Sequence, residues 1–263
     1  MKKVLLTLTA AVAFSGSAFA ADMAPRTYTK APAPMVVAPS WTGFYLFGGG
    51  GGGVWDADTG VQSTTTGAPL LGFNQRQGGN GWFGTVGGGY DWQFGGNWVA
   101  GIFGDAQFGS LKGTVQDQDP FFAGNIKNDE SWAAGARLGY LVAPNVLSYV
   151  NGGYSGSHWK GAELFDTRFS TPSGFHVDGF DRSGWFIGGG VENNLNIFGI
   201  TAPGWFMKTE YRAAYYENKN LGEFLTGTNT LGANTIGFKP LVQSVSTSLV
   251  YRFNWSGPVV AKY

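Results

Sequence analysis

The chain contains no cysteine, so its fold must close without disulfide bonds whatever the redox state of its compartment. Charged residues are also scarce: they make up 13% of the 263 residues, about half the share usual in soluble proteins. Acidic and basic residues are equal in number, 17 of each. This balance leaves no basic excess for phosphate contacts, and we therefore expect no nucleic-acid partner.

Long hydrophobic runs are the third absence. Beyond the N-terminus the chain has no apolar run of about 18 residues, which excludes a membrane protein built of helices. Glycine, with 44 residues, and aromatic residues, at 16%, are nevertheless abundant, and the mean hydropathy is −0.07. Strands that alternate between lipid and a polar interior average to such a neutral value, so the composition favours a transmembrane β-barrel.

Residues 81–94 (GWFGTVGGGYDWQF) show the pattern of such a strand. Every second residue from Trp82 is apolar or glycine, and this face ends in aromatic side chains, whereas the other face is small or polar and carries Asp91. A period of two indicates a β-strand. Trp82 and Trp92 would lie roughly 25 Å apart along a membrane normal, which is the height of the apolar band of an outer-membrane barrel.

Seven further segments repeat this pattern with varying clarity. The predicted strands are 41–56, 81–94, 98–108, 131–142, 146–157, 184–197, 205–216 and 241–253. In the first of them, six successive glycines at 48–53 hide which face is which. In the fifth, we expect Val150 and Tyr154 to face outward and Tyr149, Asn151 and Ser155 inward, because an amide in lipid is costly.

The connections between these segments differ in length. Four long polar stretches, predicted as loops, cover 58–80, 109–130, 158–182 and 217–240, and three shorter connections cover 95–97, 143–145 and 198–204. Long outer loops and short periplasmic turns alternate in this way in outer-membrane barrels. The sequence therefore predicts an all-β fold, an eight-stranded antiparallel transmembrane β-barrel.

The two ends of the chain have their own character. Residues 1–20 begin with two lysines, continue with an apolar stretch and end in Ala-Phe-Ala, which is the pattern of a cleaved signal peptide and predicts export. Residues 21–40 are rich in proline and alanine and are predicted to be an extended linker. The barrel is then expected over 41–255, followed by a C-terminal tail at 256–263.

The inward faces of the predicted strands carry four acidic and four basic residues. They are Asp91, Asp105, Arg137, Glu192, Lys208, Glu210, Arg212 and Arg252. Buried charges require partners, so this balanced set predicts ion-pair networks across the lumen. A barrel of eight strands leaves an interior that side chains just fill. This favours a polar plug over the alternative, a narrow aqueous path lined by the same charges.

Other kinds of site have little support. A Ser155, His158 and Glu163 trio can be named, but no spacing or nucleophile motif supports catalysis, and we expect no enzyme. His158 and His176 lie in or beside one predicted loop without a recognisable metal-ligand spacing. We therefore expect no metal site and no cofactor. The aromatic-rich loops could bind a partner or an apolar ligand such as haem, and the sequence leaves this open.

Several motifs carry a resemblance to a known family. They are WTGFY at 41–45, SGWFIGGGVE at 183–192, KTEYR at 208–212 and the ending YRFNWSGPVVAKY at 251–263. Together with the linker they resemble the Omp25/Omp31-type outer-membrane proteins of alphaproteobacteria, which carry an OmpA-like eight-stranded barrel. The resemblance covers essentially the whole chain beyond the predicted signal peptide.

This resemblance implies an abundant surface protein of the Gram-negative outer membrane. The expected partners are outer-membrane lipids and lipopolysaccharide, and the barrel-assembly machinery during biogenesis; the oligomeric state stays open. Family members are often labelled porins and some bind haemin, but no residue motif transfers either activity to this chain. Such barrels commonly end in an aromatic residue; Phe253 fits this role, yet residues 254–263 follow it. We expect a structural surface barrel first, a small passive channel second, and a ligand-binding or adhesive protein third.

Overall fold

The computed structural model describes residues 40–70, 75–117, 122–197 and 200–253. All described residues belong to one compact unit of the chain. The predicted signal peptide, the predicted tail and all but the last residue of the predicted linker lie outside the described residues. Within the described ranges, no helix is long and apolar enough to cross a membrane.

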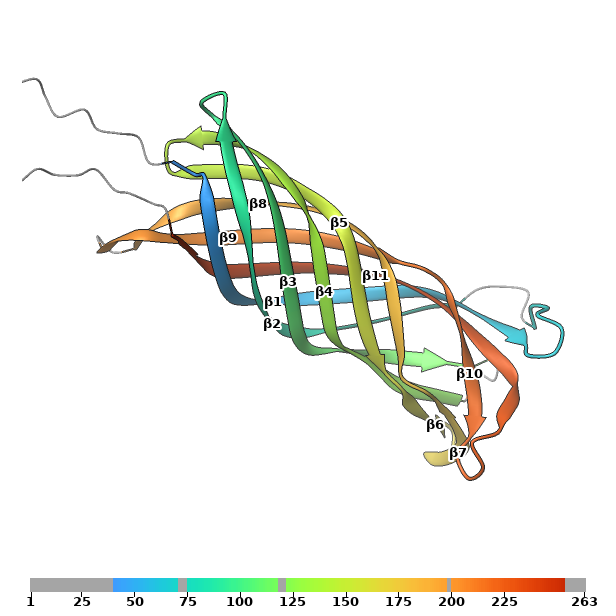
Figure 1. Cartoon of the computed structure of the whole chain (residues 1–263). Helices are drawn as coiled ribbons and strands as arrows, with labels where there is room; N and C mark the ends of the chain where they lie inside the picture. The colour runs from blue at the N-terminus through green and yellow to red at the C-terminus, as the bar shows by residue number, and fades with distance from the viewer. Residues whose placement is uncertain (1–39, 71–74, 118–121, 198–199, 254–263) are drawn as a thin grey trace, which may run out of the picture. The chain divides into compact units, whose positions relative to one another are not determined.

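The described residues form one antiparallel sheet of eleven strands that closes on itself (Figure 1). Its strands are β1 (Gly43–Ser63), β2 (Gln75–Phe94), β3 (Trp98–Gln116), β4 (Phe122–Ala143), β5 (Val146–Lys160), β6 (Ala162–Asp166), β7 (Thr171–Val177), β8 (Phe180–Ile197), β9 (Ile200–Tyr216), β10 (Lys219–Leu225) and β11 (Leu231–Arg252). β1 pairs with β11 from Tyr45–Arg252 to Ser63–Asn234, so the first and last strands complete the barrel.

At three positions around the barrel, the wall is formed by two successive strands placed end to end. β5 is continued by β6 after Gly161, β7 by β8 after residues 178–179, and β9 by β10 after residues 217–218. Near the chain ends the wall consists of β1, β2, β3, β4, β5, β8, β9 and β11, and farther away β6, β7 and β10 take the places of β5, β8 and β9. The eight predicted segments overlap with the first set.

The four predicted long loops were largely wrong. The sheet extends through 58–63 and 75–80, through 109–116 and 122–130, and through most of 158–182 and 217–240. These portions were predicted as loops because the polarity of the two strand faces inverts along the strands. Near the chain ends the outward face is apolar. In the added portions, which together form the extension of the barrel, the inward face is apolar, as Trp55, Ala57 and Val61 show, and the outward Asp58 is exposed.

The two ends of the barrel can be named by their connections. The turn end holds the tight turns 95–97 and 144–145 and the described chain ends, where the Phe253 amide donates to the Phe44 carbonyl at 3.1 Å. The loop end holds the connections 167–170 and 226–230, together with the described residues 64–70 after β1 and Asp117 after β3.

The outer wall carries a continuous apolar band on its turn-end portion. Exposed aromatic side chains border it on the turn side (Phe44, Trp92, Trp98, Tyr140, Trp205, Tyr251) and on the loop side (Trp82, Phe108, Trp132, Trp185). Between them lie exposed aliphatic side chains, among them Val86, Ile102, Leu138, Val150, Ile187 and Leu249. Trp82 is 79% exposed, which water would disfavour for so large an apolar group. Such a band fits a lipid environment.

The interior holds two separate apolar clusters. The turn-side cluster contains Trp41, Tyr45, Phe47, Val99, Phe103, Ala133, Leu141, Leu147, Tyr149, Phe186, Phe206, Ala214, Tyr216 and Val250. The loop-side cluster contains Trp55, Ala57, Phe83, Leu111, Val115, Ile126, Trp159, Leu164, Val177, Phe180, Leu221, Ile236 and Phe238. The second cluster fills the extension like the core of a soluble barrel, and the first surrounds a set of charges.

Candidate functional site in the barrel interior

The structure brings all eight charged residues of the predicted lumen set into the barrel interior. They come from six strands, and none is more than 8% exposed: Asp91, Asp105, Arg137, Glu192, Lys208, Glu210, Arg212 and Arg252. Their alternation along the strands explains this placement, since the neighbouring residues form the outward apolar band. They divide into two clusters of four.

The turn-side charge cluster is a closed ring of two acids and two bases: Asp91, Arg137, Glu192 and Arg252. Arg137 donates two hydrogen bonds to Asp91, with Nε 2.9 Å from Oδ1, and Nη1 donates to Glu192 Oε2 at 3.1 Å. Arg252 Nε donates to Glu192 Oε1 at 2.7 Å, and its Nη1 lies 2.8 Å from Asp91 Oδ2. Each charge therefore has two partners of opposite sign.

The middle charge cluster is a chain of alternating sign: Asp105, Arg212, Glu210 and Lys208. Arg212 forms a two-bonded pair with Asp105 at 2.9 and 2.7 Å and also donates to Glu210 at 2.8 Å. Lys208 Nζ lies 3.7 Å from Glu210. Tyr149 and Asn151 donate to the same Glu210 carboxylate, at 2.8 and 3.0 Å. Both charge clusters are neutral, so each buried charge is balanced by charges of opposite sign.

Aromatic rings enclose the cations from the sides. The Arg137 guanidinium lies 4.4 Å from the ring centre of Tyr45 and 5.1 Å from that of Tyr149. The Lys208 ammonium lies 3.4 Å from the ring centre of Phe47. Cations over aromatic faces gain about 2 kcal/mol or more when water is excluded. The rings therefore fill space beside the turn-side and middle charge clusters and stabilise their charges.

Inward-facing glycines provide the room for these side chains. A Cβ atom at Gly101 would collide with the Asp91 carboxylate, and one at Gly190 would lie 2.8 Å from the Tyr149 hydroxyl. Packing therefore explains the glycines at these positions: the strands carry glycine where the barrel interior holds large side chains of neighbouring strands.

Trp41 is buried at the turn end of the barrel beside Arg252, a position that the sequence pattern did not predict. It is 1% exposed, its indole nitrogen donates to the Pro144 carbonyl at 3.3 Å, and its ring lies 4.3 Å from the Arg252 guanidinium. It also packs on Phe206 at a centroid distance of 5.1 Å. Trp41 stands in the WTGFY motif, but the six glycines that follow hid the inward register in which Tyr45 and Phe47 share its side.

A buried pair of carboxyl groups in the extension was also missed. Asp117 follows β3 and Glu223 lies on β10, and both are 4% exposed. Burial, together with the nearby Asp117 carboxyl, raises the pKa of Glu223 to about 9. At neutral pH this glutamate is therefore protonated. Both residues lie in stretches that the sequence predicts to be loops, for which it predicts no inward face.

Ser155, His158 and Glu163, the possible catalytic trio, each bond to partners outside the trio. Ser155 is buried and bonded to the Trp132 carbonyl and the Tyr216 hydroxyl, both at 2.9 Å. His158 pairs with Asp181 on the exposed surface at 2.8 Å, and Glu163 accepts a hydrogen bond from Thr226 at 3.1 Å. Among the described residues, no group of three or more His, Asp or Glu side chains could hold a metal ion.

Known proteins resemble this chain in sequence and in fold. It is 29% identical over 235 residues to the 31 kDa outer-membrane immunogenic protein of Brucella melitensis, covering 84% of this chain and 90% of that one, and the Brucella suis protein matches equally. The solved structure of the outer membrane protein OprG from Pseudomonas aeruginosa gives a TM-score of 0.53 at 12% identity, over 80% of this chain and 97% of OprG. No protein-family model matches the chain.

The closed sheet, the outward apolar band and these similarities define an outer-membrane β-barrel protein, located in the outer membrane. More particularly, the chain is a relative of the Brucella 31 kDa outer-membrane immunogenic protein. This confirms the resemblance to Omp25/Omp31-type proteins that its motifs indicated.

Proposed function

We propose that this protein is a structural surface barrel of the outer membrane whose lumen is sealed by its own side chains. The observation that carries this proposal is that successive groups of inward side chains occupy the barrel interior from one end to the other. Trp41 lies at the turn end, the turn-side and middle charge clusters follow, and the loop-side apolar cluster comes last. None of these side-chain groups belongs to a separate plug domain.

The charges of the lumen act as structural contacts in this proposal. A conducting path needs charges that face water and can exchange their partners with passing ions. Here every residue of the turn-side and middle charge clusters forms an ion pair with another residue of its cluster, and each charge cluster is neutral. An interior bounded by eight strands at each level is just wide enough for side chains to fill. The lumen charges are therefore expected to hold strands together and to conduct nothing.

The proposal also orients the barrel and its partners. The turn end, with its short connections, would face the periplasm, and the extension with its hairpins would stand outside the cell. Outer-membrane lipids and lipopolysaccharide would surround the apolar band, and the barrel-assembly machinery would insert the chain after export. No reaction is assigned to the protein.

Conductance of the purified protein in planar bilayers tests the sealed lumen. We expect no sustained current at ±100 mV in salt of about 1 M, where ion pairs exposed to solvent would be screened. A general diffusion porin inserted in the same bilayer serves as the positive control. A steady current from correctly folded protein would favour the alternative of a small passive channel instead.

Surface binding is a second candidate function, favoured by aromatic side chains at the loop end. Phe169 is 72% exposed at the hairpin between β6 and β7, and Phe165 on β6 is also exposed. Exposed aromatic groups beyond the apolar band fit a contact surface for another molecule. Cells that display Phe165→Ser/Phe169→Ser protein should lose a surface interaction that cells with the parent chain possess; unchanged binding in a host-matrix screen would remove this candidate.

A further inference from the structure

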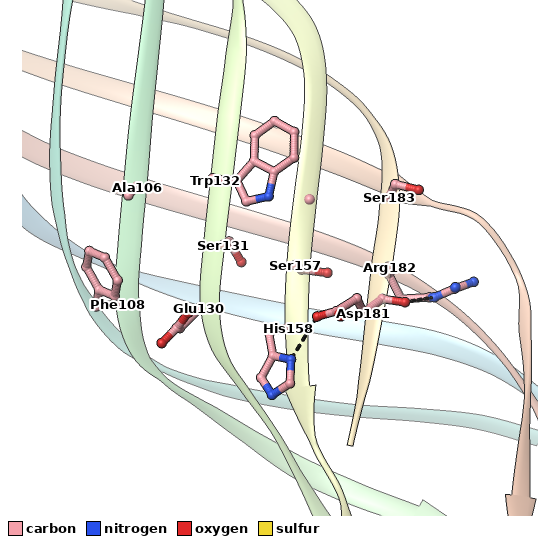
Figure 2. A pocket seen from close by; sticks show the side chains of 11 residues that line it. Ala106, Phe108, Glu130, Ser131, Trp132, Ser157, His158, Asp181, Arg182 and Ser183 are labelled. Carbon is pink, nitrogen blue, oxygen red and sulfur yellow. Dashed lines mark hydrogen bonds and ion pairs between the residues drawn. The ribbon is translucent and has the colours of Figure 1, made fainter. Parts of the chain in front are cut away.

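A hollow of about 430 Å³ lies on the outer wall at the loop-side edge of the apolar band (Figure 2). Two adjacent rows of residues line it across β3, β4, β5 and β8. The row nearer the turn end is Ala106, Trp132, Gly156 and Ser183, and the row nearer the loop end is Phe108, Glu130, His158 and Asp181. Its size lies within the range of small-molecule sites, and it joins an apolar floor to a charged rim.

The hollow exists because Ala106 and Gly156, in the row nearer the turn end, lack large side chains. Figure 2 shows Phe108 and Trp132 on either side of Ala106, whose methyl group is the floor. The indole of Trp132 lies over Gly156, where a Cβ atom would approach its Cε2 to 2.6 Å. Tyr154 packs beside the indole at a centroid distance of 5.7 Å. The two aromatic walls are thus held apart above a shallow floor.

The rim carries more negative than positive charge. Asp181 faces the ring of His158. The main chain of Glu130 pairs with β3 and β5, but its exposed carboxylate takes part in no side-chain hydrogen bond or ion pair among the described residues. The cation of the rim, Arg182, is occupied by main-chain oxygens: it donates to Asp181 at 2.6 Å and to Asn218 at 3.1 Å. Figure 2 shows its guanidinium pointing away from Glu130. Among the acidic and arginine side chains of the rim, two carboxylates, Glu130 and Asp181, stand against the one guanidinium of Arg182.

We propose that this hollow binds the ammonium headgroup of an amphipathic lipid. The ammonium group would lie near Glu130, against the faces of Trp132 and Phe108, while the acyl chains continue along the apolar band below. Carboxylates supply charge complementarity, and aromatic faces attract cations. A lipid is the expected ligand because the floor of the hollow is continuous with the apolar band on the outer wall. The site lies outside the wall, so it is independent of whether the lumen conducts.

Native mass spectrometry of the purified full-length barrel tests this site. The probes are phosphatidylethanolamine and phosphatidylglycerol with identical acyl chains, offered at equal concentration in the same micelles. We expect ethanolamine lipid adducts to exceed glycerol lipid adducts by about threefold to tenfold, which corresponds to ~0.7–1.4 kcal/mol. Equal adducts, or a preference for the anionic lipid, would overturn the proposal.

Two variants locate the preference. Glu130→Gln removes the unpaired carboxylate at constant size, and Ala106→Phe fills the floor; each should bring the adduct ratio close to one. The matched controls are Asp58→Asn, an exposed acid on β1, and Ala136→Phe, an exposed alanine of the apolar band. Both controls should keep the parent ratio. A preference that survives in both test variants, or that disappears in the controls, places the binding elsewhere and refutes this site.

Discussion

Asp91 and Arg137 lie 46 residues apart in sequence and form a two-bonded ion pair inside the barrel, with both side chains almost fully withdrawn from solvent. Neither residue can be removed alone without leaving the other's charge buried. The same holds for Glu192 and Arg252, which complete the ring. The ring therefore links β2, β4, β8 and β11 through side chains, independently of the main-chain ladder.

Asp91→Ala is expected to lower the free energy of unfolding by about 3–5 kcal/mol, because Arg137 and Arg252 would keep their buried charges with one partner fewer. Urea unfolding in micelles, followed by the gel mobility shift of heated against unheated protein, measures the change. Asp56→Ala is the matched control, since its ion pair with Arg76 is largely exposed and should be worth less than ~1 kcal/mol.

Removing both partners together gives the sharper result. Asp91→Leu/Arg137→Met replaces the pair with apolar groups and leaves Glu192 paired with Arg252, so it should be clearly more stable than Asp91→Ala. Equal losses in the single and double variants would show that the charge balance of the ring contributes nothing.

Trp41→Ala is expected to destabilise the barrel without opening it. The variant loses the contacts of the indole with Arg252 and Phe206, and a buried aromatic residue replaced by alanine costs about 3–5 kcal/mol. The two charge clusters still fill the bore beyond it, so bilayer recordings should remain silent. A steady current from folded Trp41→Ala protein would mean that the indole alone had sealed the lumen.

Glu223 predicts a pH dependence of the extension. Its folded-state pKa is raised to about 9, whereas an unfolded glutamate titrates near 4.5, so the folded state keeps a proton that the unfolded state loses between these values. The stabilisation is complete below the unfolded pKa and is lost as the pH rises through 9. Hydrogen exchange of the β10 amides should therefore accelerate from pH 5 to pH 9 beyond its intrinsic base catalysis.

Glu223→Gln has no proton to lose and should flatten this dependence. Glu217→Gln, at an exposed position just before β10, is the control and should behave like the parent chain. The same corrected exchange profile for Glu223→Gln and the parent chain would contradict the role of this carboxyl group.

The sequence could predict the inward register of Glu192 or Lys208 because a charge in lipid is so costly that alternation in a membrane strand decides its face. It could not predict which acid meets which base. Arg212 reaches Asp105, 107 residues away, only through the stagger of several strands around the barrel. Pairing across a lumen depends on this stagger, which no local pattern encodes.

The extension was missed for a different reason. Beyond the apolar band the inward face becomes apolar and the outward face polar, so a strand there no longer matches the pattern of the membrane portion. Leu111 and Val115 are buried on alternate positions of β3, and the intervening Lys112 is exposed. This short alternation was present in the sequence, but threonine, glycine and charged residues around it favoured a loop.

Gly101 and Gly104 test whether the glycines of the wall make room for the lumen charges. Both lie on β3, three residues apart and on opposite faces. A Cβ atom at Gly101 would collide with the Asp91 carboxylate and lie 2.9 Å from the Tyr90 carbonyl, whereas at Gly104 the nearest atom, the Ala133 carbonyl oxygen, is 3.7 Å away. Gly101→Ala should therefore displace Asp91 from its ring and cost about 1–3 kcal/mol, as overpacking does elsewhere. Gly104→Ala should be nearly neutral in the same urea titration. Equal effects of the two variants would mean that these glycines serve the strand backbone alone, and that the room they leave inside the barrel has no bearing on its stability.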